Sequence, residues 1–104
     1  MQILPWLIPA AVLPSGASMA NSANTLDNLQ AAFNGERNAN ARYLAFAQKA
    51  DEEGYGEVAS TFRAAAKAAE IHANNHAAVI RQLGAEPVAH LEHALQRLAL
   101  SSSL

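Results

Sequence analysis

Apolar and small residues recur every three or four positions along two stretches of the chain. In the first stretch, residues 26–50, one line of positions carries Leu26, Leu29, Phe33, Glu36, Asn40, Tyr43, Ala47 and Ala50. In the second, residues 57–83, the corresponding line carries Val58, Phe62, Ala65, Ala69, His72, His76, Val79 and Leu83. This spacing is typical of one face of an α-helix. The pattern therefore predicts two long helices, and we call the two lines their seams.

Short signals around these stretches predict where the helices begin and end. Thr25 or Asn24 can cap the first helix, because its side-chain oxygen can accept a hydrogen bond from a free amide of the first turn. Gly54 and Gly56, in "DEEGYGE", break the pattern and predict a hairpin turn. Gly84 is placed to end the second helix. The sequence thus predicts an all-α antiparallel hairpin, which is half of a four-helix bundle.

The hairpin is expected to occupy residues 25–86, and a different pattern follows it. Residues 87–104 hold Leu91, Leu95 and Leu98 at helical spacing, which predicts a short C-terminal helix and tail. The alternative interpretation is foreign sequence after a truncation or a frameshift. The residue pattern does not separate these two interpretations.

Residues 1–24 form an apolar extension whose first twenty positions carry no charged side chain. Pro5, Pro9 and Pro14 interrupt any long helix, so a membrane span of roughly 20 uninterrupted apolar residues is not predicted. Three interpretations stay open: upstream sequence before a start at Met19, a signal peptide, or an ordered element. Small residues near a cleavage position favour a signal peptide, and the absence of Lys and Arg before it opposes one. The predicted location is cytoplasmic, with export as the alternative.

Composition narrows the class of protein. The chain has 104 residues, of which 51% are apolar, a net charge of −2 and no cysteine. These values are typical of one small soluble domain, and they give no basic surface for nucleic acid. Disulfides and cysteine-ligated metal sites, including a rubredoxin-like iron site, are excluded. Phosphate-binding loops and paired nucleophiles are not found either, which opposes nucleotide-binding and hydrolase functions.

Both seams become polar in the middle, where candidate chemistry lies. The first seam carries Glu36 and Asn40 there, and the second carries His72 and His76. If the helices fold back about Gly54, residues 36 and 72 lie at the same level, since each is 18 positions from the turn. A buried carboxylate without a partner costs several kcal/mol. A cation shared with an imidazole nitrogen would compensate it.

Two structural alternatives account for the same residues. A histidine on an apolar face can simply be hydrogen-bonded in the core, and His76 can also face a subunit edge. A seam glutamate can extend to solvent or pair with Arg37 or Arg42. The spacing of the residues leaves the metal site and these alternatives open.

The residues from "LQAAFNGERNANARYLAFAQKADEEGYGEVASTFRAAAKAAEIHA" resemble the first half of the rubrerythrin diiron domain, in the ferritin-like group. The resemblance covers Leu26 to Leu83. It rests on a Gly-Glu followed seven residues later by Tyr, on the "EEGY" turn, and on a second helix with a histidine at the position of a Glu-x-x-His motif. It implies four antiparallel helices around two irons, held by carboxylates and histidine, that reduce peroxide or oxidise ferrous iron.

The resemblance also implies roles for individual residues. Glu36 matches the glutamate ligand of the first helix, and His72 matches the histidine of Glu-x-x-His. Tyr43 matches a tyrosine near the metals and is the candidate catalytic residue. Ala69 stands where the motif has glutamate, and Glu70, one position later, is turned about 100° away. This removes a carboxylate that bridging of two irons requires. The candidate metal ligands are Glu36, His72, Glu70 and His76.

A hairpin of this size buries too little apolar surface to be stable alone. The simplest expectation is a two-fold homodimer that completes a four-helix bundle and brings two copies of Glu36 and His72 together. These donors suit non-haem iron, singly or as a pair, and also zinc or manganese. The predicted function is an iron oxidoreductase with an external electron donor. The alternatives are a non-catalytic helical dimerisation module and a hairpin that completes its bundle with a different chain.

Overall fold

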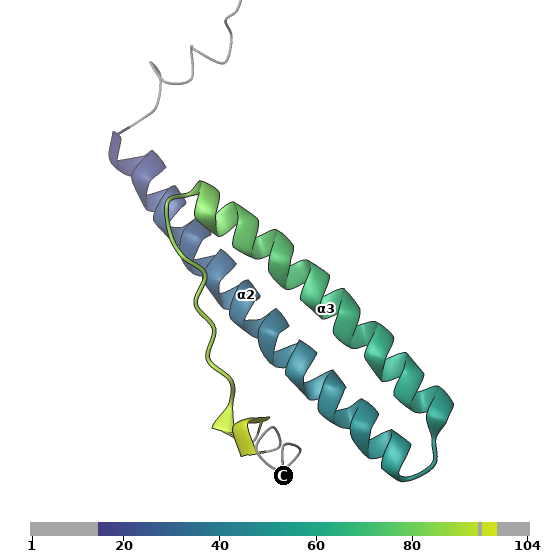
Figure 1. Ribbon diagram of the computed structural model, residues 1–104. Helices are drawn as coiled ribbons and strands as arrows, with labels where there is room; N and C mark the ends of the chain where they lie inside the picture. Colours follow the sequence, from purple (N-terminus) through teal and green to yellow (C-terminus); the bar gives the residue numbers. More distant parts are fainter. Residues whose placement is uncertain (1–14, 94, 98–104) are drawn as a thin grey trace, which may run out of the picture.

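The computed structural model describes residues 15–93 and 95–97, and two long helices dominate it (Figure 1). Helix α2, Ser15–Glu52, and helix α3, Gly56–Gln82, lie side by side as an antiparallel pair. The chain then runs back along α2 and re-enters helical structure at His93. The predicted all-α hairpin with a short C-terminal helix is confirmed.

Helix α2 begins earlier than its sequence signals indicated. Thr25 was expected to cap it, but α2 starts at Ser15 and passes through Thr25 without a break. The physical reason is that no proline follows Pro14 in this region, so nothing forces the helix to end there. A threonine caps a helix only where the backbone already turns away. Residues 1–14 lie outside the described structure, and the interpretations of that segment stay predictions.

Both helices end at a glycine, as predicted. Gly54 and Gly84 have φ angles of 85° and 84°, a left-handed conformation that glycine adopts without steric cost. The amide of Tyr55 donates to the carbonyl of Ala50 (2.8 Å), and the amide of Ala85 makes the equivalent bond at the end of α3 (3.2 Å). These bonds are those of the Schellman motif, which satisfies carbonyls that the helix end would leave free.

Alanine forms most of the contact between the helices. The residues that α3 buries are Ala59, Ala66, Ala69, Ala73, Ala77 and Ile80. They pack against α2, where Ala47 and Ala50 of the predicted seam are buried. Small side chains allow two helices to approach closely, and this narrows the distance between their axes.

The predicted α3 seam does not face α2 along its whole length, so its predicted orientation is wrong. Val58, Val79 and Leu83 are 46%, 40% and 46% exposed, and they lie on one side of the buried alanines. Together with Ala65 and His72 they form a line along α3 that we call the open stripe. The pattern of large apolar residues followed this line, because alanine gives only a weak hydrophobic signal. In the described part of the chain, nothing covers the open stripe.

Three carboxamides of α2 hold the returning segment, residues 86–92, which we call the strap. Gln30, Asn34 and Asn38 stand one helical turn apart and bind the backbone of alternate strap residues. The distances are 2.8 Å to the carbonyl of Glu86, 3.0 Å to the amide of Val88, 2.7 Å and 2.9 Å to the amide and carbonyl of His90, and 2.9 Å to the amide of Glu92.

The spacing of helix and strap explains this ladder of carboxamides. Four helical residues rise about 6.0 Å, and two extended residues span about 6.6 Å, so each turn of α2 meets every second strap residue. Arg42 adds an ion pair to Glu92 (3.5 Å), and Leu95 is buried just beyond the strap. The two helices lie side by side in one layer, and no second helical layer covers it in the residues described. Neither helix, over the residues described, is long and apolar enough to cross a membrane.

Candidate metal centre

Glu36 and His72 face each other across the hairpin. The Nδ1 atom of His72 lies 3.3 Å from Oε2 of Glu36, as the equal distance of both residues from the turn predicted. The Glu36 side chain is 26% exposed and that of His72 is 58% exposed, since His72 belongs to the open stripe. A carboxylate and an imidazole therefore meet at the surface of the layer, open on one side.

The separation of the two groups fits shared coordination of one cation. Two donors bound to a cation at about 2.1 Å, with roughly 100° between the bonds, lie about 3.2 Å apart. The oxygen of Glu36 and the nitrogen of His72 can therefore hold one ion without movement of either helix. They fit a metal centre in part, because a stable site needs further donors on the open side.

The two candidate residues next to this pair along α2 have other contacts. Asn40 donates a hydrogen bond from Nδ2 to the carbonyl oxygen of Ala66 (2.8 Å), which links the helices. Tyr43, seven residues beyond Glu36, stacks on Phe62 with 6.2 Å between ring centroids. Phe62 also contacts Phe46, at 5.3 Å. Tyr43 is thus held at the edge of an aromatic cluster, about 10 Å along the helix from Glu36.

Glu70 points away from this centre. Its Oε1 atom lies 2.7 Å from Nζ of Lys67. The hydrogen bond from Lys67, and the charge of its ammonium, hold the pKa of Glu70 below its ordinary value. Ala69, which stands where the resemblance has a glutamate, is 4% exposed and packs between the helices. The missing carboxylate is therefore not replaced by its neighbour in this conformation.

The two helices bring together Glu36 and His72 from the predicted ligand set. His76 lies one turn beyond His72 and is half-buried. Within residues 15–93 and 95–97, no three histidine, aspartate or glutamate side chains converge as a metal site. Arg42, one alternative partner for Glu36, pairs with Glu92.

Sequence reasoning missed two features near the centre. It did not predict that Asn40 binds the backbone of α3, or that Phe62 holds Tyr43 in place. The register that placed residue 36 opposite residue 72 also places 40 near 66 and 43 near 62. The same register therefore contained the signal for both contacts.

Known proteins with similar sequences cover this same region. The family model described as Rubrerythrin matches residues 27–101, which include most of α2, all of α3 and the strap. The chain is 43% identical over 60 residues to nigerythrin of Nitratidesulfovibrio vulgaris, covering 58% of this chain and 30% of that protein. It is 36% identical over 61 residues to rubrerythrin-2 of Clostridium acetobutylicum, covering 59% of this chain and 33% of that protein.

The matches to these relatives cover only part of each protein. The aligned part spans about a third of the length of each relative. No solved structure matches the chain significantly. The family match does extend beyond the strap to residue 101, so it includes most of the tail for which foreign sequence was an alternative interpretation.

Proposed function

Because the chain belongs to the rubrerythrin family, we propose that it binds iron at a centre built on Glu36 and His72. The observation that carries this proposal is the 3.3 Å contact between a carboxylate of α2 and an imidazole of α3. The two groups have the separation of neighbouring ligands and open onto an uncovered face. Zinc and manganese suit the same donors, so the metal must be identified by experiment.

The proposed activity is reduction of peroxide or oxidation of ferrous iron. Bound iron would supply the redox chemistry of either reaction. The chain's own residues would position this chemistry: Glu36 and His72 would hold the metal, and the hydrogen bond from Asn40 to α3 would keep the two helices together beside it. Tyr43, stacked on Phe62, would be the candidate donor of a proton or an electron. The chain has no cysteine for an iron–thiolate centre, so the electrons would come from an external donor.

Further donors are needed to complete the centre, and a second copy of the chain would supply them. A homodimer would double the carboxylate and imidazole of each hairpin and convert one helical layer into a four-helix bundle. His76 is the next candidate ligand, since it lies one turn beyond His72. Glu70 has the least support, because its carboxylate is bound to Lys67.

The test is the iron content after anaerobic loading with Fe(II) and desalting, with the oligomeric mass measured on the same sample. We expect about one iron per chain for a dinuclear centre in a dimer, or half an iron for a single ion on the two-fold axis. Glu36→Gln and His72→Ala should each abolish retention. Glu57→Gln, which changes an exposed glutamate at the start of α3, should retain the parent iron content.

A positive iron result would then be followed by assays of activity. Hydrogen peroxide should be consumed by the iron-loaded protein with a reductant present, and Tyr43→Phe should slow this consumption. Iron retained equally by the parent and by the Glu36→Gln variant would contradict the assignment of the centre.

The buried position of Ala69 favours a second candidate, a non-catalytic helical module that has lost its metal centre. Ala69→Glu distinguishes the two candidates. If the centre lacks only this ligand, the variant should bind iron more tightly than the parent. A purely structural module should lose stability by several kcal/mol instead, because the new carboxylate would be buried between the helices without a partner.

A further inference from the structure

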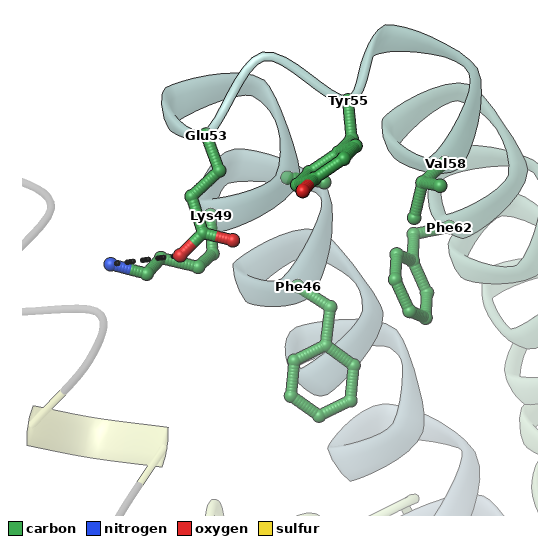
Figure 2. A pocket seen from close by; sticks show the side chains of 7 residues that line it. Phe46, Lys49, Glu53, Tyr55, Val58 and Phe62 are labelled. Carbon is green, nitrogen blue, oxygen red and sulfur yellow. Dashed lines mark ion pairs between the residues drawn. The ribbon is translucent and has the colours of Figure 1, made fainter.

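A pocket of about 500 Å³ lies between the helices near the turn, away from the candidate centre (Figure 2). Its lining is apolar, with Lys49 and Glu53 paired at its rim (3.7 Å). The other lining residues are Phe46, Ala50, Tyr55, Val58 and Phe62. Aromatic side chains therefore surround a hollow that is large enough for one or two aliphatic side chains.

The opposite end of the open stripe carries exposed aliphatic side chains. Val79 and Leu83 are 40% and 46% exposed near the C-terminal end of α3. Phe62 of the pocket lies ten residues before His72, and Leu83 lies eleven residues after it. The hollow begins about 15 Å from the candidate centre, at Phe62, and Leu83 lies about 16.5 Å from the centre in the other direction along the helix. Leu83 therefore lies at a distance that matches the near edge of the hollow.

We propose that this face is the docking surface for a second copy of the chain, with Leu83 of each copy filling the pocket of the other. The two-fold axis would lie between the two layers, at right angles to the helices and level with Glu36 and His72. Each α3 would then run antiparallel to the α3 of the other copy. This inference rests on the proposed function, because it specifies how two half-centres meet.

Two different two-fold axes could stack one layer on the other: one at right angles to the helices and one parallel to them. Close packing favours the first. An axis parallel to the helices would place pocket against pocket and would stack α3 of each copy on α2 of the other, so that Leu83 would lie far from either pocket. That arrangement would leave two hollows facing each other, and unfilled apolar space is destabilising. The perpendicular axis places a projecting side chain at each hollow, as close packing requires.

The same axis matches the remaining positions. Ala65 and Val79 each lie seven residues from His72, so Ala65 of one copy meets Val79 of the other. At the centre, the two Glu36 carboxylates approach each other. Two like charges repel at short range, and a divalent cation between them removes that repulsion. Cation binding and docking should therefore strengthen each other.

The absence of cysteine in the chain makes this arrangement directly testable. In the variant Ala65→Cys/Val79→Cys, oxidised glutathione should link two chains and stop at the covalent dimer on a non-reducing gel. The two positions are about 21 Å apart along α3, too far for a disulfide within one chain. The matched control is Ala64→Cys/Ala78→Cys, which has the same spacing at exposed positions off the open stripe.

Two outcomes would overturn the proposal. One is equal cross-linking of the control, and the other is a folded, helical variant that forms no cross-link at either low or high concentration. Linkage into chains longer than two would also contradict the closed two-fold arrangement. Circular dichroism on each variant establishes that the helices are intact.

A second variant tests the pocket itself. Leu83→Asp should weaken the dimer roughly tenfold or more by sedimentation, because it places a charge in an apolar hollow. Val88→Asp alters an exposed strap residue and should leave the dimer unchanged. Equal effects of the two variants would contradict the role of Leu83.

Measurements on metal-free protein separate this inference from the proposed function. Specific cross-linking of Ala65→Cys/Val79→Cys in a protein that retains no iron would support docking and contradict the iron centre. Iron retained by a protein that stays monomeric by sedimentation would support the iron centre and contradict the docking.

Discussion

Asn38 is buried, with 3% of its surface exposed, and its carboxamide contacts three backbone groups. It donates to the carbonyls of Asn34 and His90, each at 2.9 Å, and it accepts from the amide of Glu92 at 2.9 Å. A buried carboxamide with these partners stabilises the strap, whereas an apolar replacement would leave the amide of Glu92 without its acceptor.

We expect Asn38→Ala to lower the free energy of unfolding by about 1–3 kcal/mol, the usual cost of leaving a buried polar group unsatisfied. Urea denaturation measures this change. Asn75→Ala, at an exposed position of α3, is the control and should change stability by less than about 0.5 kcal/mol. Equal effects of the two variants would show that the strap does not depend on Asn38.

Glu70 gives a prediction about pH. Lys67 lowers its pKa in the folded state below the ordinary 4.5. A group with a lowered pKa adds stability that is present above its unfolded pKa and is lost as the pH falls. The parent should therefore unfold at a slightly higher temperature than Glu70→Gln at neutral pH, and the difference should shrink as the pH falls below 4.5. A difference that persists at pH 2 would contradict this origin, and Lys67→Met should abolish it at every pH.

The residue-level contacts differ in how far sequence could predict them. The contact between Glu36 and His72 followed from helical spacing and from the position of Gly54, because two straight antiparallel helices fix the level of every residue. The contacts of Asn38 did not follow, because the strap has no periodicity that locates it. Gln30 and Asn34 share a helical face with Asn38, but polar residues at that spacing usually face solvent.

At the scale of the elements, α3 shows why the orientation of a helix is harder to predict than its existence. The spacing, the glycines and the turn fixed its bounds to within a residue. Its buried face consists of alanine, whereas its larger residues Val58 and Leu83 lie on the open stripe. In the proposed dimer, the large apolar residues would lie on the face that meets the second copy. In a single hairpin, that face is not the one between the two helices.

Two glycines, one at the end of α3 and one inside α2, give a pair of predictions with opposite effects on stability. Gly84→Ala should lower stability by about 1 kcal/mol, because its φ of 84° is unfavourable for alanine although the space around it is open. Gly35→Ala, inside α2 with nothing within 4 Å of the added methyl group, should raise stability by roughly 0.5–1 kcal/mol. Thermal unfolding of both variants checks the pair, and changes of the same sign would contradict the backbone explanation.

At the scale of the whole molecule, the two helices form one layer, with apolar side chains on its open face. Single layers are marginal because each helix buries one side only. Association should therefore contribute a large share of the stability. We expect the temperature of unfolding to rise with protein concentration, as it does whenever a partner binds the folded state alone. A midpoint that is constant over a hundredfold range of concentration would contradict this expectation.

The ladder formed by Gln30, Asn34 and Asn38 restricts where proline can stand in the strap. It uses the amides of even-numbered positions, and the strap's one proline, Pro87, falls at an odd number. The three carboxamides bind backbone amides and carbonyls of the strap, so these hydrogen bonds do not depend on which side chains the strap carries. Sequence drift in the strap should therefore be tolerated, except for proline at positions 88, 90 and 92. For the same reason, the strap is a place where new side chains could be displayed along a fixed line without disturbing the helices that hold it.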